Sequence, residues 1–135
     1  MKKILILISV VFISLNAKSQ YVEHDTKLKE KFGTYVFKGH SLPNFPLHYL
    51  KYAKVTKRLN DYVFHKLSEY TEYNLYGDVE GFTIIYRNDG SIDSINFWLR
   101  NILIYSADYY KGASKVEKTE YYPLQEYYSY HDDIK

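Results

Sequence analysis

Residues 82–98 read FTIIYRNDGSIDSINFW, and this stretch predicts a β-hairpin. Its turn contains Asn88-Asp89-Gly90, and an Asp-Gly pair tolerates the positive φ angles that tight hairpins require. In the second strand Ile95, Phe97 and Leu99 alternate with polar or amphipathic residues, which indicates one buried face. The hairpin is therefore the clearest element of the fold.

The residues before the hairpin predict an amphipathic helix over about 51–70. Apolar side chains recur there at steps of three and four residues, and no helix breaker occurs before Gly77. The residues on this apolar face are Val55, Leu59, Tyr62, Val63, Leu67 and Tyr70. Helix and hairpin together indicate an α+β fold.

The remaining segments are shorter and less regular. Residues 35–37 form a strand-like run, whereas the two prolines of residues 41–46 argue against regular structure there. Residues 101–111 suit either a helix or a strand, and the helix is favoured. The run 116–130 is strand-like but contains Pro123, which predicts an edge strand.

After residue 20 the sequence contains no internal repeat, low-complexity tract or linker, so residues 20–135 are expected to form one domain. The predicted fold class is α+β. Because the chain has no cysteine, a hydrophobic core must hold this domain together without disulfides.

The chain contains seventeen tyrosines, and they have two interpretations. A tyrosine ring is large and apolar with one polar group, which suits sugar stacking and protein interfaces. Because the aromatic residues are spread through the sequence, a biased composition that fills the core is favoured. Whether the tyrosines form a binding surface or only core stays open.

Residues 1–19 predict a cleavable secretory signal peptide. Lys2 and Lys3 precede an apolar stretch over 4–15, and Ala17-Lys18-Ser19 supplies a small-residue junction. The stretch has twelve residues, whereas a membrane-spanning helix needs about 20. We therefore expect a periplasmic or secreted protein with no stable membrane insertion after cleavage.

Removal of residues 1–19 also changes the charge. The whole chain has 18 basic and 16 acidic residues, and three of the basic ones, Lys2, Lys3 and Lys18, belong to the signal segment. The remaining domain has 15 basic against 16 acidic residues, a net charge of −1. Such a domain lacks the basic face whose counterion release drives nucleic-acid binding, so no nucleic-acid partner is expected.

The usual catalytic signatures are absent from the sequence. It has no Gly-x-Ser-x-Gly elbow, His-Glu-x-x-His zinc helix, phosphate-cradling glycine loop or cysteine nucleophile. Asp61 and His65 are four apart on the predicted helix and could offer two metal ligands, but no third ligand is identifiable. We therefore predict no enzyme, no cofactor and no metal site.

Four short motifs carry a resemblance to a known family. Tyr70-Thr71-Glu72 is followed at a matching distance by Asp78-Val79-Glu80-Gly81, then by the turn and second strand of residues 89–95, and near the end by residues 116–122 with Pro123-Leu124. Over roughly residues 45–125 the chain thus resembles the carboxyl-terminal domain of TonB-type energy transducers. It departs from the family where Thr71 replaces a proline and where a Trp-x-Pro-Gly is missing before the last strand.

The resemblance implies a three-stranded sheet with helices on one face and a last strand with an open edge. Family members pair that edge with an extended segment of an outer-membrane transporter. The binding residues this implies here are Val116, Lys118, Glu120, Tyr121, Tyr122 and Tyr127. Without a membrane anchor and proline-rich spacer, the domain cannot transmit force by itself.

The leading functional interpretation is an exported, non-enzymatic protein- or peptide-binding domain whose partner is a periplasmic segment of an outer-membrane transporter. Two alternatives remain: a tyrosine-lined glycan or small-ligand binding protein, and an unrecognised secreted enzyme. The tyrosines near the last strand also have a plainer interpretation, which is that they protect an exposed sheet edge.

Overall fold

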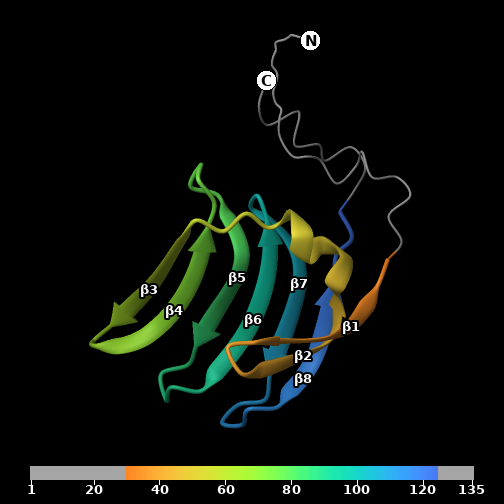
Figure 1. The fold of residues 1–135 in the computed structure, drawn as a ribbon. Coiled ribbons are helices and arrows are strands. Elements are labelled where there is room, and N and C mark those ends of the chain that lie inside the picture. The colour runs from red at the N-terminus through yellow and green to blue at the C-terminus, as the bar shows by residue number, and fades with distance from the viewer. Residues whose placement is uncertain (1–29, 125–135) are drawn as a thin grey trace, which may run out of the picture. The chain divides into compact units, whose positions relative to one another are not determined.

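The computed structural model describes residues 30–124, so the predicted signal peptide (1–19) and Tyr127 lie outside the described residues. The described chain is built from strands, with one short 3-10 helix (Figure 1). In order, the elements are β1 (Phe32–Phe37), β2 (His40–Pro46), the 3-10 helix η2 (Leu47–Tyr52), β3 (Lys57–Val63), β4 (Lys66–Tyr73), β5 (Val79–Tyr86), β6 (Ile92–Leu99), β7 (Ile102–Tyr109) and β8 (Val116–Tyr121).

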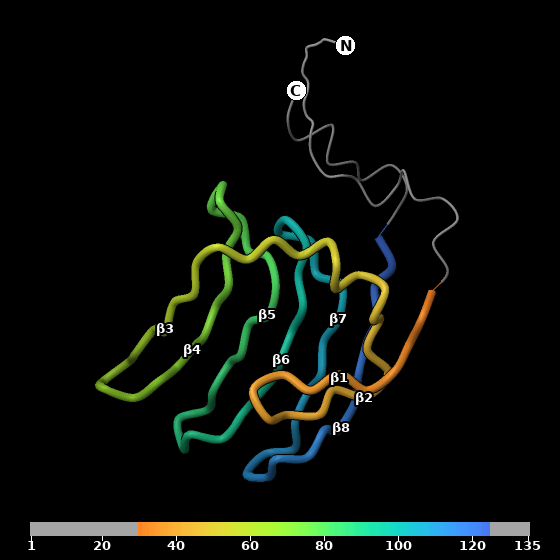
Figure 2. The backbone as a smooth tube through the Cα atoms, in the orientation of Figure 1, coloured from red at the N-terminus to blue at the C-terminus, as the bar shows by residue number. Residues whose placement is uncertain are grey.

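Strands β3 to β8 form a six-stranded antiparallel sheet in sequence order, and β1 and β2 form a separate two-stranded hairpin. The hairpin lies across one face of the large sheet, and the connection 53–56 runs along one end of the sheet from η2 to β3 (Figure 2). Strands β3 and β8 are the two edges of the large sheet.

The predicted α+β class is wrong. Within residues 30–124 the longest helix is η2, with six residues, and the face expected to carry helices is covered by the β1–β2 hairpin. The sheet has six strands where about three were expected. This fold also differs from the one that the family resemblance implies. No helix among the described residues is long and apolar enough to cross a membrane.

The predicted helix over 51–70 is wrong, because this stretch contains β3 and half of β4. They are joined by Phe64 and His65, whose φ angles are +50° and +65°. Positive φ at both positions of a two-residue loop is the pattern of a type I′ hairpin turn, which Asn-Gly normally signals. All residues of β3 are exposed, so apolar and polar residues do not alternate along it. The apparent helical spacing comes from taking two successive strands of a hairpin as one element.

The hairpin predicted over 82–98 is confirmed as β5 and β6. Phe82 lies opposite Phe97 and Ile84 opposite Ile95, while the Asp89 carboxylate accepts a hydrogen bond from the backbone N–H of the residue two positions later in the turn. The predicted inward residues of β6, Ile95, Phe97 and Leu99, are completely buried.

The strand expected over 35–37 is confirmed within β1, but the irregular structure expected over 41–46 is wrong, because these residues belong to β2. Pro43 lies in a bulge, and Pro46 is the last residue of β2. Between the pairs Gly33–Phe45 and Tyr35–Leu42, β2 has one residue more than β1, and Asn44 there has a φ of +56°.

At the other end of the chain, the helix favoured over 101–111 is wrong and the edge strand is confirmed. Residues Ile102–Tyr109 form β7, in which a register shift leaves the neighbours Ile104 and Tyr105 both fully buried. Two consecutive buried residues break the period of two, which hid the strand. Strand β8 is an edge of the sheet, as Pro123 predicted.

Aromatic rings fill the space between the hairpin and the sheet. The ring centroid of Phe45 in β2 lies 5.2 Å from that of Phe97 and 4.9 Å from that of Tyr105, and Phe37 in β1 stacks on Phe82 at 4.2 Å. Within residues 30–124, four of the thirteen tyrosines are buried: Tyr49, Tyr70, Tyr105 and Tyr109. These four belong to the core, and the other nine are half-buried or exposed.

Candidate functional site

The β3 edge, defined as residues 57–64, is the most exposed apolar part of the sheet. All seven residues of β3 are exposed, with Leu59 at 39% and Tyr62 at 61%, and the adjacent turn residue Phe64 is 91% exposed. An edge strand presents unpaired N–H and C=O groups, and proteins usually shield such edges with charge, proline or a covering element. An edge with exposed Leu, Tyr, Val and Phe side chains is suited to pairing with another strand.

The opposite edge, β8, has the features of a shielded one. Its exposed residues are mainly charged, with Glu117, Lys118 and Glu120 along the strand, and Pro123 follows shortly after it. The Lys118 amine lies 4.0 Å from the Glu120 carboxylate. Charged residues and proline discourage the addition of a further strand. Strand β3 has three charged residues of its own, Lys57, Arg58 and Asp61. The two edges therefore differ in the exposed apolar residues Leu59, Tyr62 and Val63, which have no exposed counterpart on β8.

The structure brings only some of the predicted binding residues together. The Tyr122 hydroxyl donates a 2.6 Å hydrogen bond to the Glu120 carboxylate, next to Lys118. Tyr121 is instead directed toward β1 and η2: its ring centroid lies 5.0 Å from that of Phe32 and 6.3 Å from that of Tyr49, and its hydroxyl donates to Glu30 at 2.7 Å. Burial together with hydrogen bonding raises the pKa of this phenol. Val116 is half-buried opposite Tyr109, and Tyr127 lies outside the described residues.

A buried carboxylate ties the β3 edge to the sheet. Glu72 on β4 lies opposite Arg58, and the Arg58 Nε atom is 3.5 Å from the Glu72 carboxylate. The same carboxylate accepts hydrogen bonds from the Tyr70 hydroxyl at 2.5 Å and the Phe82 backbone N–H at 2.8 Å. Burial and the bond to Glu72 raise the pKa of Tyr70. Glu72 thereby joins β3, β4 and β5.

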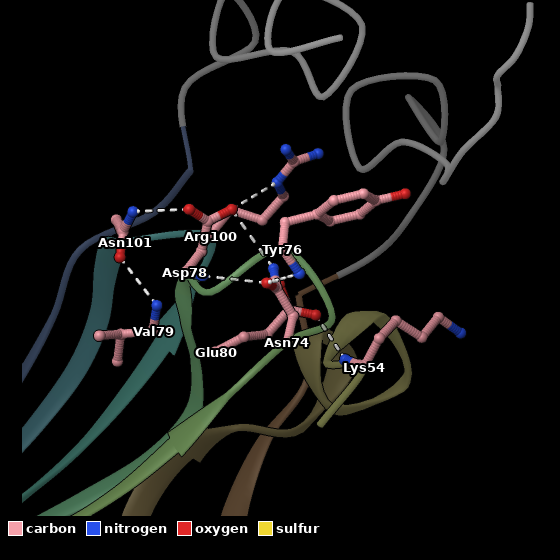
Figure 3. A network of polar contacts seen from close by, with 8 residues as sticks. All are labelled: Lys54, Asn74, Tyr76, Asp78, Val79, Glu80, Arg100 and Asn101. Atoms are coloured by element: carbon pink, nitrogen blue, oxygen red, sulfur yellow. Dashed lines mark hydrogen bonds and ion pairs between the residues drawn. The ribbon is translucent and has the colours of Figure 1, made fainter. Parts of the chain in front are cut away.

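A second buried carboxylate, Glu80, fixes the connection that leads into β3 (Figure 3). It accepts hydrogen bonds from the Lys54 backbone N–H at 2.5 Å and the Asn74 side-chain amide at 3.1 Å. Asn74 also closes the β4–β5 turn, because its side-chain oxygen accepts from the backbone N–H groups of Tyr76 at 2.9 Å and Asp78 at 3.0 Å. The chain just before β3 is therefore tied, through Glu80 and Asn74, to the hydrogen-bonded β4–β5 turn.

The network continues to the next turn along the same end of the sheet. The Asp78 carboxylate accepts from the Asn101 side-chain amide at 3.0 Å and lies 3.4 Å from Arg100 Nε, and Asn101 accepts from the Val79 N–H at 2.8 Å (Figure 3). These side chains form hydrogen bonds and an ion pair with one another and with the backbone of the two turns. The network therefore serves to position the backbone at this end of the sheet. Sequence reasoning missed it, and the only signal was the spacing of Asn74 and Asp78 around Gly77.

Burial raises the pKa of Glu80, although the hydrogen bonds it accepts act in the opposite direction. A raised pKa means that the folded state binds the proton more tightly than the unfolded state does. The associated stability is therefore fully present below the ordinary pKa of 4.5 and is lost as the pH rises through the folded-state pKa.

We expect the free energy of unfolding of the wild type, relative to Glu80→Gln, to increase as the pH falls from about 7 to about 4. Urea unfolding at several pH values measures this difference. Asp89→Asn is the matched control, because hydrogen bonds from Ser91 lower the pKa of Asp89. The free energy of unfolding of the wild type, relative to Asp89→Asn, should therefore decrease as the pH falls. A flat difference for Glu80→Gln across this range would contradict the assignment.

The turn residue Phe64 has a left-handed backbone conformation that is unfavourable for an aromatic residue. An aromatic residue at a φ of +50° is sterically disfavoured, whereas Asn tolerates this region. We expect Phe64→Asn to stabilise the fold by about 0.5–1 kcal/mol, because the side chain is 91% exposed and little packing is lost. Thermal unfolding checks this, with Phe64→Ala as the control that removes the ring alone. A less stable Phe64→Asn protein would show that the ring packs in solution.

Asp61 and His65, the pair considered for a metal, lie on β3 and in the following turn and do not share a helix face. Within residues 30–124 no group of three or more His, Cys, Asp or Glu side chains is placed to hold a metal ion. Compared with known proteins, the chain matches no family model, no curated protein and no solved structure.

Proposed function

We propose that the protein is an exported, non-enzymatic domain that binds a protein by adding one extended segment of it to the β3 edge. The observation that carries this is the exposure of every residue of β3, apolar ones included, on an outer strand of the sheet. In strand addition the main-chain hydrogen bonds give affinity, and side chains beside the edge give selectivity. The signal peptide predicted over 1–19 supports export.

The β3 edge is also held firmly enough to act as a template. Arg58 is tied to the buried Glu72, and the backbone of Lys54 just before the strand is tied to the buried Glu80. A strand that is already ordered loses less conformational entropy when it pairs with a partner. Outer-membrane transporters, the partner class implied by the family resemblance, remain one source of such a segment.

The experiment selects binders from a library of random eight-residue peptides displayed on phage, using the full signal-processed chain. Leu59→Lys combined with Val63→Lys places charge on the edge and is expected to abolish binding of the selected peptides. Tyr122→Lys is the matched control and leaves binding unchanged, because Tyr122 lies next to β8 and its exposure of 42% is close to the 39% of Leu59. Loss of binding in Tyr122→Lys alone would move the site to β8 and overturn the β3 assignment.

A further inference from the structure

We propose that the partner at the β3 edge is a second copy of this chain, paired antiparallel through a two-fold axis at Leu59. This inference rests on the proposed strand addition at β3 and names its occupant. Such an interface is isologous, since each copy uses the same strand.

The regular part of β3 is centred on Leu59. Its register with β4 is unbroken from Lys57, opposite Tyr73, to Asp61, opposite Glu69, and it shifts only beyond Asp61. The straight segment available to a second strand is therefore residues 57–61. Because side chains alternate along a strand, those of Lys57, Leu59 and Asp61 lie on one face of the sheet.

This segment is self-complementary when it is reversed. Pairing two copies about Leu59 places Leu59 against its equivalent, and Lys57 of each copy against Asp61 of the other. Both ion pairs lie on the same face as the apolar central pair. Opposite charges directly across an antiparallel pair are favourable, and like charges are unfavourable.

The charge of Asp61 supports this register. Within one chain Asp61 lies opposite another acidic residue, Glu69 on β4. Lys57 has an aromatic residue opposite it, Tyr73. A second copy would place a lysine amine on the outer side of Asp61, where no acidic residue lies opposite it.

The two neighbouring two-fold registers on the side of Asp61 are worse. An axis at Asp61 would set the two Asp61 carboxylates against each other, and an axis at Asn60 would set Leu59 against Asp61. On the β8 edge the Lys118 amine is already paired with the Glu120 carboxylate of the same strand at 4.0 Å, and Pro123 follows the strand, so further addition at the outside of the pair is disfavoured. The assembly therefore closes as a dimer.

Charge reversal tests the register by sedimentation equilibrium of the full signal-processed chain. Lys57→Asp alone and Asp61→Lys alone each create two like-charge contacts, and we expect each to weaken dimerisation about tenfold or more. The double variant Lys57→Asp with Asp61→Lys restores two opposite-charge contacts and should return the dimer to near wild-type affinity. Recovery in the double variant cannot come from a folding defect in either single one.

Lys118→Asp on β8 is the matched control, since it makes the same change of charge on the other edge and should leave the dimer intact. A dimer that responds to Lys118→Asp and ignores the β3 variants would overturn the proposal, as would a wild-type chain that stays monomeric. A monomer that still binds selected peptides through β3 would refute self-pairing and leave the proposed strand addition standing.

Discussion

Phe45→Ala is expected to lower the free energy of unfolding by about 3–5 kcal/mol, the range found when a buried phenylalanine is truncated. Phe45 is completely buried, and its ring packs against Tyr35, Phe82, Phe97 and Tyr105 at centroid distances of 5.4, 5.6, 5.2 and 4.9 Å. The ring lies between the β1–β2 hairpin and the large sheet, so a cavity there weakens the contact between the two layers.

Urea unfolding monitored by Trp98 fluorescence measures this loss. Phe32→Ala is the matched control: Phe32 also makes aromatic contacts, with Tyr121 at 5.0 Å, but it is 45% exposed. Its truncation should cost about 1 kcal/mol, because nearly half of its surface stays in contact with water on folding. Similar losses for both variants would show that the hairpin does not rest on the sheet through Phe45.

The sequence predicts the parts of the fold where turn residues, alternation or a proline determine the local structure. The β5–β6 hairpin was predicted because Asp89-Gly90 fits its turn and because Ile95, Phe97 and Leu99 keep a strict alternation. The edge position of β8 was predicted from Pro123, since proline cannot serve a central strand.

The rest of the fold depends on contacts that a local pattern does not record. In β4 the consecutive residues Tyr70, Thr71 and Glu72 are all buried. Their burial does not alternate with a period of two, because it is determined by the curved sheet and by the elements that neighbour β4. Glu72 reads as a solvent-facing residue in any local pattern. Its burial depends on Arg58 and on the backbone of Phe82, which lies ten residues away.

The candidate site at β3 could not be predicted from a local sequence pattern either. The β3 edge is exposed because of its place at the end of the strand order, and no residue within it signals that place. Leu59 and Tyr62 were assigned to the buried face of a helix, whereas both are exposed. The turn that separates β3 from β4 was missed because Phe64-His65 lacks the usual residues of a type I′ turn.

Gly81→Ala is the second change expected to have a large effect, because it acts on the carboxylate that anchors β3. Gly81 lies on β5, where three residues, 80–82, occupy the space opposite Glu72, and its φ is +99°. A Cβ atom at this position would collide with the Glu72 carboxylate and with a methyl group of Val55. The chain must then strain its backbone and also displace a buried charge from its partners.

We expect Gly81→Ala to cost about 3–5 kcal/mol of stability, the upper range for single substitutions. Gly77→Ala is the matched control, since Gly77 has a similar φ of +88° but no atom within 4 Å of the added Cβ. That variant carries the backbone strain alone, about 1–2 kcal/mol. The excess of Gly81→Ala over Gly77→Ala in urea unfolding therefore measures the displacement of Glu72. Equal losses in the two variants would mean that the Glu72 side chain can move at no cost. Glu72 would then not anchor the β3 edge.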